Sequence, residues 1–188
     1  MLDDMTADRS VAQSLPKPRN PDEPYRICIV CLGNICRSPM AEVVLRTELA
    51  EAGLAGEVIV DSAGTGDWHA GEAMDSRASA ELSRRGFDGS GHVARQISGH
   101  WLDRYDLLLA MDANNYEDLL ALAPGQPGVR ARIRLLRSFD PDAPAGAEVP
   151  DPYYGSPADY AEVFELVAAA AAGLAGRLAA EFPTGSPS

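Results

Sequence analysis

Short apolar runs alternate along most of this chain with longer segments that have helical spacing. The first run, YRICIVC from Tyr25, is rich in apolar and β-branched residues without helical spacing, so it predicts a buried strand. Three further runs, EVIVDSAG, YDLLLAMD and RIRLL, also predict strands. The segments PMAEVVLRTELAEAG, DSRASAELSRRG and ANNYEDLLALA predict helices. This alternation predicts an α/β fold in three layers, with a parallel sheet covered by helices on both faces.

The expected ends of these helices carry residues that start and stop helices. Ser38 is the predicted N-cap of the first helix, Pro39 its first residue and Gly53 its stop. Gly86 is expected to end the second helix, and Asp112 to cap the third.

The last long segment, from Pro157 to Phe182, predicts one amphipathic helix. Its apolar side chains recur at spacings of three, four and seven and form a single stripe: Tyr160, Val163, Phe164, Val167, Leu174 and Leu178. Four charged residues interrupt its alanine-rich part: Glu162, Glu165, Arg177 and Glu181. We therefore expect this helix to pack on the sheet, and we expect no membrane partner.

Length and composition predict a single domain from 25 to 182. A chain of 188 residues can bury one full core. Residues 1–24 are polar and proline-containing, without the apolar stretch of a secretory signal, and predict a disordered lead. Residues 183–188, PTGSPS, predict a flexible tail.

Charge and cysteine usage exclude several classes of function. The net charge is -12 and the chain has one lysine, Lys17, so no nucleic-acid partner is expected. Cys28, Cys31 and Cys36 lie within nine residues, with no distant cysteine and no neighbouring histidine. This spacing argues against a disulfide scaffold and against a metal site. Reduced thiols in a cytoplasmic protein are expected.

The loop after the first strand has the composition of an anion site. The strand brings Cys31 to the carboxyl edge of the sheet, where open parallel sheets bind ligands. The loop that follows leads directly into a helix and contains Leu32, Gly33, Asn34, Ile35, Cys36, Arg37 and Ser38. Its backbone N–H groups and the helix N-terminus can converge on an anion, and the same positive field favours an ionised Cys31 thiolate. Arg37 supplies a planar fork suited to two phosphoryl oxygens.

VCLGNICRSPMAE resembles the signature loop of the low-molecular-weight protein tyrosine phosphatases residue for residue. The resemblance continues through DSAGTGDWH, HVARQI, AMD and DPYYG, and covers about Arg26 to Leu178. It implies a four-stranded sheet in the order 2-1-3-4, phosphotyrosine-containing protein substrates, and inorganic phosphate as product and inhibitor. It also implies that no cofactor or metal is needed.

The resemblance also implies roles for individual residues. Cys31 would be the nucleophile, Arg37 would bind the phosphoryl group, and Asp151 would act as general acid and then as base. Asn34, Ser62 and His92 would hold the loop, while Ser38 would bond the thiolate. The family's aromatic pocket walls would correspond to Trp68, Tyr153 and Tyr154.

Several residues have alternative interpretations. Cys28 is expected to be a core residue. Cys36 could be a loop-packing thiol or, by the resemblance, could trap oxidised Cys31 as a reversible disulfide, and both interpretations stay open. Tyr153 and Tyr154 could also be turn aromatics or phosphorylation sites. His69 and His100 receive no role, and the arginines are expected to form a solvated edge at positions 130, 132, 134 and 137.

Three other functions fit the sequence less well. Arsenate reductases on this scaffold need further cysteines later in the chain, and this chain has none after Cys36. Phosphoarginine phosphatases tend to carry threonine where this chain has the bulkier, apolar Ile35. A non-catalytic phosphoprotein-binding module would need neither a nucleophile such as Cys31 nor an acid such as Asp151.

Overall fold

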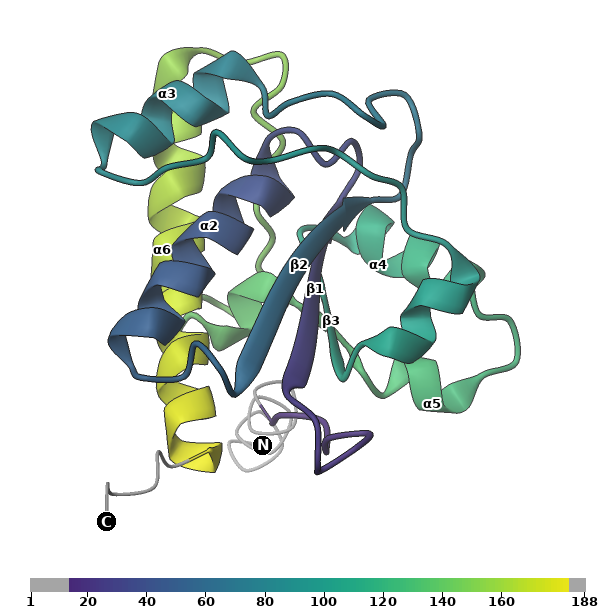
Figure 1. The fold of residues 1–188 in the computed structure, drawn as a ribbon. Helices are drawn as coiled ribbons and strands as arrows, with labels where there is room; N and C mark the ends of the chain where they lie inside the picture. The colour runs from purple at the N-terminus through teal and green to yellow at the C-terminus, as the bar shows by residue number, and fades with distance from the viewer. Residues whose placement is uncertain (1–13, 183–188) are drawn as a thin grey trace.

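The computed structural model describes residues 14–182 and contains one four-stranded parallel sheet. The strand order is β2-β1-β3-β4, which confirms the predicted fold class and order. The strands are β1 (Tyr25–Cys31), β2 (Val58–Gly64), β3 (Leu107–Ala110) and β4 (Ile133–Leu135). Strand β1, buried at every position except Arg26, lies between β2 and β3 (Figure 1).

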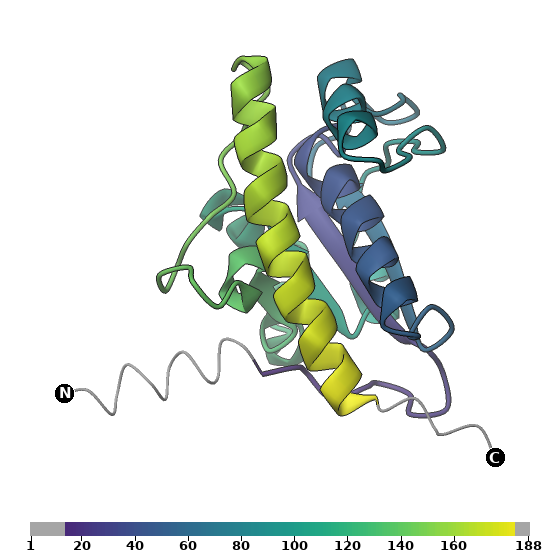
Figure 2. The same cartoon turned by 90° about the vertical axis from the view of Figure 1, so that its left-hand side faces the viewer.

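Helices cover both faces of this sheet, as Figures 1 and 2 show. On one face lie α2 (Arg37–Glu51), α3 (Ser76–Arg84) and α6 (Pro157–Glu181). On the other lie the 3₁₀ segment η1 (Gly99–Arg104), α4 (Ala113–Ala121) and the short α5 (Pro127–Arg130). A second 3₁₀ segment, η2 (Leu136–Phe139), follows β4 and packs on α6.

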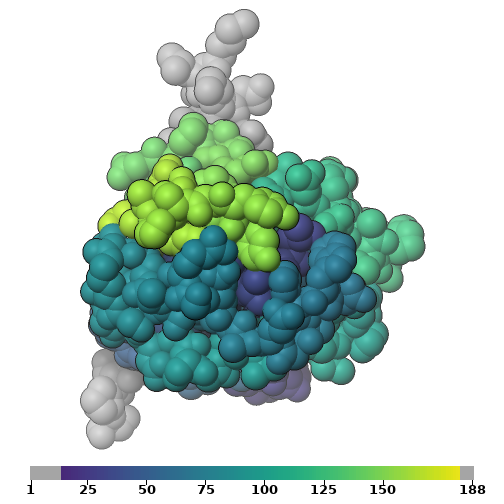
Figure 3. Space-filling model, turned by 90° about the horizontal axis from the view of Figure 1, so that it is seen from above, coloured from purple at the N-terminus to yellow at the C-terminus, as the bar shows by residue number. Residues whose placement is uncertain are grey.

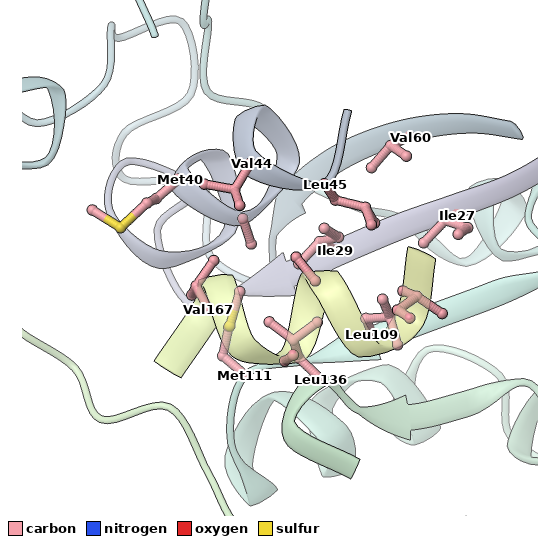
Figure 4. Close-up of a cluster of buried hydrophobic side chains, with 14 of the residues drawn as sticks. Ile27, Ile29, Met40, Val44, Leu45, Val60, Leu109, Met111, Leu136 and Val167 are labelled. Atoms are coloured by element: carbon pink, nitrogen blue, oxygen red, sulfur yellow. The ribbon is translucent and has the colours of Figure 1, made fainter. Parts of the chain in front are cut away.

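Alternation along β1 divides the core into two clusters. Ile27 and Ile29 pack with α2, α3 and α6, while Cys28 and Val30 pack toward η1 and α4. Figure 4 shows Ile27 and Ile29 among the side chains of the larger cluster. Since successive strand residues point to opposite faces, β1 supplies both cores. The expected core position of Cys28 is confirmed.

The predicted cap of α2 is wrong. The helix begins at Arg37, its N-cap is Cys36, and no side chain caps it. The Ser38 hydroxyl points back to the strand ends and lies 3.0 Å from Cys31 Sγ. The stops predicted at Gly53 and Gly86 fit their positive φ angles of 75° and 85°, which glycine adopts without strain.

Helix α6 carries the predicted stripe, and all six of its apolar side chains are buried. By length and composition alone, α6 could cross a membrane, which is weak evidence for a membrane span. In the structure its stripe packs against α2, α3 and η2, so α6 is a core helix (Figure 2).

Residues 14–24 contact the domain at the end of the sheet where β1 begins. Tyr25 Oη donates to the Pro16 carbonyl at 3.0 Å, and the Arg19 backbone N–H donates to Asp106 at 2.6 Å. The Tyr25 ring lies 5.4 Å from that of Phe182, just beyond α6. The disordered lead was predicted for residues 1–24, of which 14–24 are described and make these contacts. The rest of that prediction and the one for residues 183–188 fall outside the described residues.

Two of the arginines near β4 do not form the expected solvated edge. The Arg132 side chain is 12% exposed and donates to the carbonyls of Leu102, at 2.7 Å, and Tyr105. Arg137 is 17% exposed and pairs with Asp140 at 3.1 Å. Their guanidinium groups satisfy loop carbonyls and a buried carboxylate, a role that strand alternation does not reveal.

Candidate functional site

The candidate site is the loop that follows β1 at the carboxyl edge of the sheet. Cys31 ends the strand and is 2% exposed. Its Sγ lies 3.0 Å from Ser38 Oγ and accepts the Asn34 backbone N–H at 3.3 Å. Strand β2 lies on one side of β1 and strand β3 on the other, so the loop occupies the point where strand order reverses.

Asn34 fixes the shape of this loop. It is fully buried and has a left-handed φ of 55°, a region that asparagine tolerates better than most residues. Its Nδ2 donates to Ser38 and to Ser62, each at 2.9 Å. Its Oδ1 accepts the Arg95 backbone N–H at 3.0 Å. The side chain therefore uses its donors and its acceptor to hold one strained turn.

His92 holds the same turn from the other side. Its Nε2 lies 2.6 Å from the Asn34 carbonyl, and because a carbonyl can only accept, Nε2 carries the proton. Burial holds the pKa of His92 below its ordinary value, and the bond to Asn34 offsets part of that effect. The structure thus brings Asn34, Ser62 and His92 together around one turn, and these are the three residues that the family resemblance named.

Glu42 extends this network and was not expected from the sequence. The Ser62 hydroxyl donates to Glu42 Oε2, and Arg46 Nη2 pairs with the other oxygen at 2.7 Å. A glutamate in the first turns of a helix is normally exposed to solvent, so the sequence around Glu42 does not indicate that it is buried.

Gly64 is a second residue that sequence reasoning missed. A Cβ at this position would lie 2.7 Å from the Leu32 carbonyl oxygen and 3.0 Å from the Gly33 carbonyl carbon. The loop therefore rests directly on the end of β2. Backbone bonds from Thr65 to Cys31, at 2.9 Å, and from Gly66 to Leu32, at 2.8 Å, hold the two segments together.

Arg37 is 2% exposed and its guanidinium is held by three groups. Nη1 donates to Asp112 at 2.6 Å and to the Val149 carbonyl at 3.1 Å, and Nη2 donates to Asp151 at 2.8 Å. Burial acts to lower the pKa of Arg37, but the Cys31 sulfur, Asp112 and Asp151 outweigh it, so its pKa is raised.

Asp112 has two functions, of which the sequence predicted one. Its Oδ1 caps α4 by accepting the Asn115 N–H at 2.8 Å, as expected. Its Oδ2 holds Arg37 across a sequence separation of 75 residues. The pattern of residues along the chain does not reveal a contact between two residues that are so far apart in the sequence.

A pocket of about 320 Å³ opens above the loop. Figure 3 looks onto this end of the molecule, where purple atoms from β1 and its loop lie between the blue-to-teal and the yellow-green segments. The pocket is lined by Cys31, Leu32, Gly33, Ile35, Cys36, Arg37, Trp68, His69, Asp151, Tyr153 and Tyr154. It therefore gathers the predicted nucleophile, phosphate ligand, acid and aromatic walls.

The aromatic side chains of the pocket differ in how firmly they are held. Trp68 is 69% exposed, and its ring lies over Gly66, whose added Cβ would meet it at 1.9 Å. Tyr153 is partly buried and forms an edge-on contact with Tyr154, with ring centroids 5.0 Å apart. Tyr154 is 97% exposed.

No role was expected for His69 from the sequence, but this residue lines the pocket. Its Nδ1 lies 2.8 Å from Glu72, and its ring centroid lies 6.0 Å from that of Tyr153. The sequence signal was the position of His69 directly after Trp68.

Cys36 lines the pocket but is buried, with 5% exposure, and its Sγ lies 3.5 Å from Tyr160 Oη. Burial raises the pKa of Cys36 to about 12, so its thiol is protonated at neutral pH. Cys28, Cys31 and Cys36 are all free thiols in this structure.

The fold and the pocket together are those of an α/β protein with a cysteine and an arginine in a loop at the carboxyl edge of its parallel sheet. The family model described as low molecular weight phosphotyrosine protein phosphatase matches residues 26–184, and the chain belongs to this family. Its members are phosphoric monoester hydrolases.

Individual relatives agree with this assignment. A low molecular weight protein-tyrosine-phosphatase of Streptomyces coelicolor is 50% identical over 80% of this chain and 91% of its own length. The crystal structure of YfkJ from Bacillus subtilis has a TM-score of 0.79 and 36% identity, covering 86% of this chain and 99% of that one. Vibrio vulnificus Wzb, solved in complex with benzylphosphonate, has a TM-score of 0.70 and 28% identity, with coverage of 81% and 98%.

Proposed function

We propose that this chain hydrolyses phosphotyrosine in proteins through a phosphocysteine intermediate, without a metal or cofactor. The main support is one arrangement of side chains: the Cys31 thiol, the buried Arg37 guanidinium and the Asp151 carboxyl line a single pocket. A nucleophile, an oxyanion ligand and an acid in one cavity are the groups that phosphoryl transfer to a thiol requires.

In the first step, the Cys31 thiolate attacks phosphorus, so that a P–S bond forms while the bond to the tyrosyl oxygen breaks. Asp151, entering as the carboxylic acid, gives its proton to the leaving oxygen. Arg37 Nη2 moves from Asp151 to the phosphoryl oxygens, and the guanidinium binds them more strongly as their charge spreads. Ser38 and the Asn34 N–H lie beside the sulfur and stabilise its anionic form.

In the second step, water hydrolyses the phosphocysteine. Asp151, now a carboxylate, takes a proton from the water, whose oxygen forms a new bond to phosphorus as the P–S bond breaks. The Cys31 thiolate leaves with the Ser38 hydroxyl 3.0 Å away. Inorganic phosphate is the product, and it inhibits because it fits the same anion site.

The pocket walls favour an aryl phosphate. Trp68 and Tyr153 provide aromatic surfaces above the loop, and flat side chains suit a phenyl ring. Wzb, a relative, was solved in complex with benzylphosphonate, a phosphonate that carries a phenyl ring. We infer phosphotyrosine-containing proteins as substrates, in the cytoplasm, where free thiols persist.

Hydrolysis of p-nitrophenyl phosphate in the presence of a chelator tests this proposal. We expect full turnover in chelator and none in Cys31→Ser, because serine is a poor nucleophile at neutral pH. Cys28→Ala is the matched control, since Cys28 lies in the core and away from the pocket. Loss of activity in chelator, or a Cys31→Ser variant that still turns over, would contradict the proposal.

The substrate class needs a separate comparison. Wild-type protein should hydrolyse a phosphotyrosine peptide faster than the same peptide carrying phosphoserine or phosphoarginine. Faster release from phosphoarginine would move the proposal to that class, and the contacts of Ile35 would then have to accommodate a guanidinium.

A further inference from the structure

Arg77, on α3, contacts the pocket from outside. Its Nη1 donates to the Tyr153 carbonyl at 2.9 Å, and its Cζ lies 5.6 Å from the centre of the Tyr153 ring. The same guanidinium lies 4.9 Å from the ring of Tyr160. One side chain therefore holds both the backbone and the ring of Tyr153, a pocket wall.

Asp75 fixes Arg77 and also contacts the loop that follows β1. The two side chains form a bidentate pair, with Nε to Oδ1 at 3.0 Å and Nη2 to Oδ2 at 2.8 Å. The Asp75 backbone N–H donates to the Ile35 carbonyl at 2.8 Å. A bidentate pair restricts the guanidinium to one plane, so Arg77 is positioned relative to the loop itself.

The same series of contacts continues to Asp151. The Tyr153 backbone N–H donates to Asp151 Oδ1 at 3.2 Å. Polar contacts and short backbone segments therefore connect Ile35 to Asp75, Arg77, Tyr153 and finally Asp151. The segments joined in this way are far apart in sequence, since 76 residues separate Arg77 from Tyr153.

We propose that Arg77 is a positioning residue that sets the distance and direction of Asp151 and Tyr153 relative to the loop carrying Cys31. This inference rests on the proposed function, because it assigns to Arg77 the alignment of the acid and of one aromatic wall. Arg77 does not line the pocket and touches no reacting atom.

The proposal predicts a dependence on the leaving group. A phenolate that leaves easily needs little help from an acid, whereas a poor leaving group needs a well-placed proton. If Arg77 aligns Asp151, its loss must slow phenyl phosphate more than p-nitrophenyl phosphate. The phosphate site itself, built from the loop and Arg37, should keep its affinity for inorganic phosphate.

The test compares Arg77→Gln with Arg84→Gln. Arg84 lies on the same helix, is 59% exposed and pairs with Glu81. Arg84→Gln is therefore the matched control, because it also removes one arginine from α3. Arg77→Gln should lower kcat/KM for phenyl phosphate about tenfold more than for p-nitrophenyl phosphate, since small misplacements of catalytic groups have effects of at least this size. Its inhibition by phosphate should stay at the wild-type value.

A double-mutant cycle completes the test. In an Asp151→Asn background, Arg77→Gln should add no further preference between the two substrates, because the group that it aligns is gone. Arg77→Lys retains a positive charge and serves if Arg77→Gln folds poorly. A single ammonium cannot form the bidentate pair and also reach Tyr153, so an intermediate leaving-group effect is expected.

Two results would overturn the inference. One is an Arg77→Gln enzyme that loses activity equally on both substrates, which indicates a structural role alone. The other is a leaving-group preference that is the same in Arg77→Gln and Arg84→Gln. Either requires an active wild type, whereas a wild type inactive on both substrates would contradict the proposed function and not this inference specifically.

Discussion

Arg37 Nη2 and Asp151 Oδ2 are joined by an ion pair of 2.8 Å, and both residues line the pocket. The group proposed to hold the phosphoryl oxygens therefore bonds the group proposed to donate the proton. In the proposed mechanism, a phosphoryl dianion competes with Asp151 for this guanidinium, and its binding frees the carboxyl to turn toward the leaving oxygen.

Asp151→Asn should separate binding from turnover. The amide cannot transfer a proton, so kcat for phenyl phosphate should fall by about 10² to 10⁴, the usual range for general acid–base groups. Inorganic phosphate should inhibit the variant more strongly, because a carboxylate no longer repels the anion or competes for Arg37. Steady-state kinetics with phosphate inhibition measure both effects. Asp142→Asn, at an exposed aspartate that does not line the pocket, is the control.

Asp112→Asn should weaken the contact that holds the Arg37 guanidinium, without unfolding α4. Asparagine caps helices about as well as aspartate, so the bond to Asn115 can persist. The charged contact to Arg37 is lost, and kcat/KM should fall by roughly tenfold, as expected for loss of one charge-assisted hydrogen bond. Thermal unfolding provides the check: a large fall in Tm would show that the cap, and not Arg37, explains the lost activity.

Gly64→Ala should displace the loop. The added Cβ would meet the Leu32 carbonyl at 2.7 Å, and a backbone atom cannot rotate away as a side chain can. We expect a loss of about 1–3 kcal/mol in the free energy of unfolding, together with loss of most activity. Gly56→Ala is the control, because nothing lies within 4 Å of a Cβ there. Equal urea midpoints for the two variants would refute this reading of Gly64.

His92 should make the domain less stable in mild acid. Its pKa in the folded state is lowered by burial, so the unfolded chain binds more protons below the ordinary pKa of 6.5. The contribution of neutral His92 is complete above that pH and is lost as pH falls through 6.5 toward the folded pKa. Urea unfolding at pH about 7.5 and about 5.5 should show a smaller loss in His92→Gln than in wild type. An equal loss in both proteins would show that other groups cause the change.

The thiols should differ in reactivity toward iodoacetamide at neutral pH. Burial keeps Cys36 protonated, with a pKa of about 12, whereas Cys31 lies beside Arg37, Ser38 and the Asn34 N–H. Peptide mass spectrometry should find Cys31 alkylated first, and inorganic phosphate should protect it. Earlier modification of Cys36 would contradict the proposed charge distribution in the loop.

The parts of the fold that depend on local pattern were predictable from the sequence. Buried strands such as β1 appear as continuous apolar runs, and α6 shows its stripe in the spacing of Tyr160, Val163 and Val167. The loop between Cys31 and Ser38 was predictable because its residues are adjacent in the chain.

Contacts between distant segments were not predictable by pattern alone. Arg37 bonds Asp112, Ser62 bonds Glu42, and Arg77 bonds Tyr153, and none of these pairs has a characteristic spacing. Ser38 shows the opposite error. A serine before a proline is a common helix start, but here the hydroxyl does not cap α2 and instead lies within hydrogen-bond distance of the Cys31 sulfur.

The ring contact between Tyr25 and Phe182 has a practical consequence for handling the protein. β1 starts at Tyr25 and ends at Cys31, so about 20 Å of strand separates this contact from the pocket. Both ends of the described chain lie at the far end of the sheet (Figure 1). An affinity tag, a fluorophore or a surface tether that replaces residues 1–13 or 183–188 would therefore be attached at the end of the sheet opposite the pocket mouth.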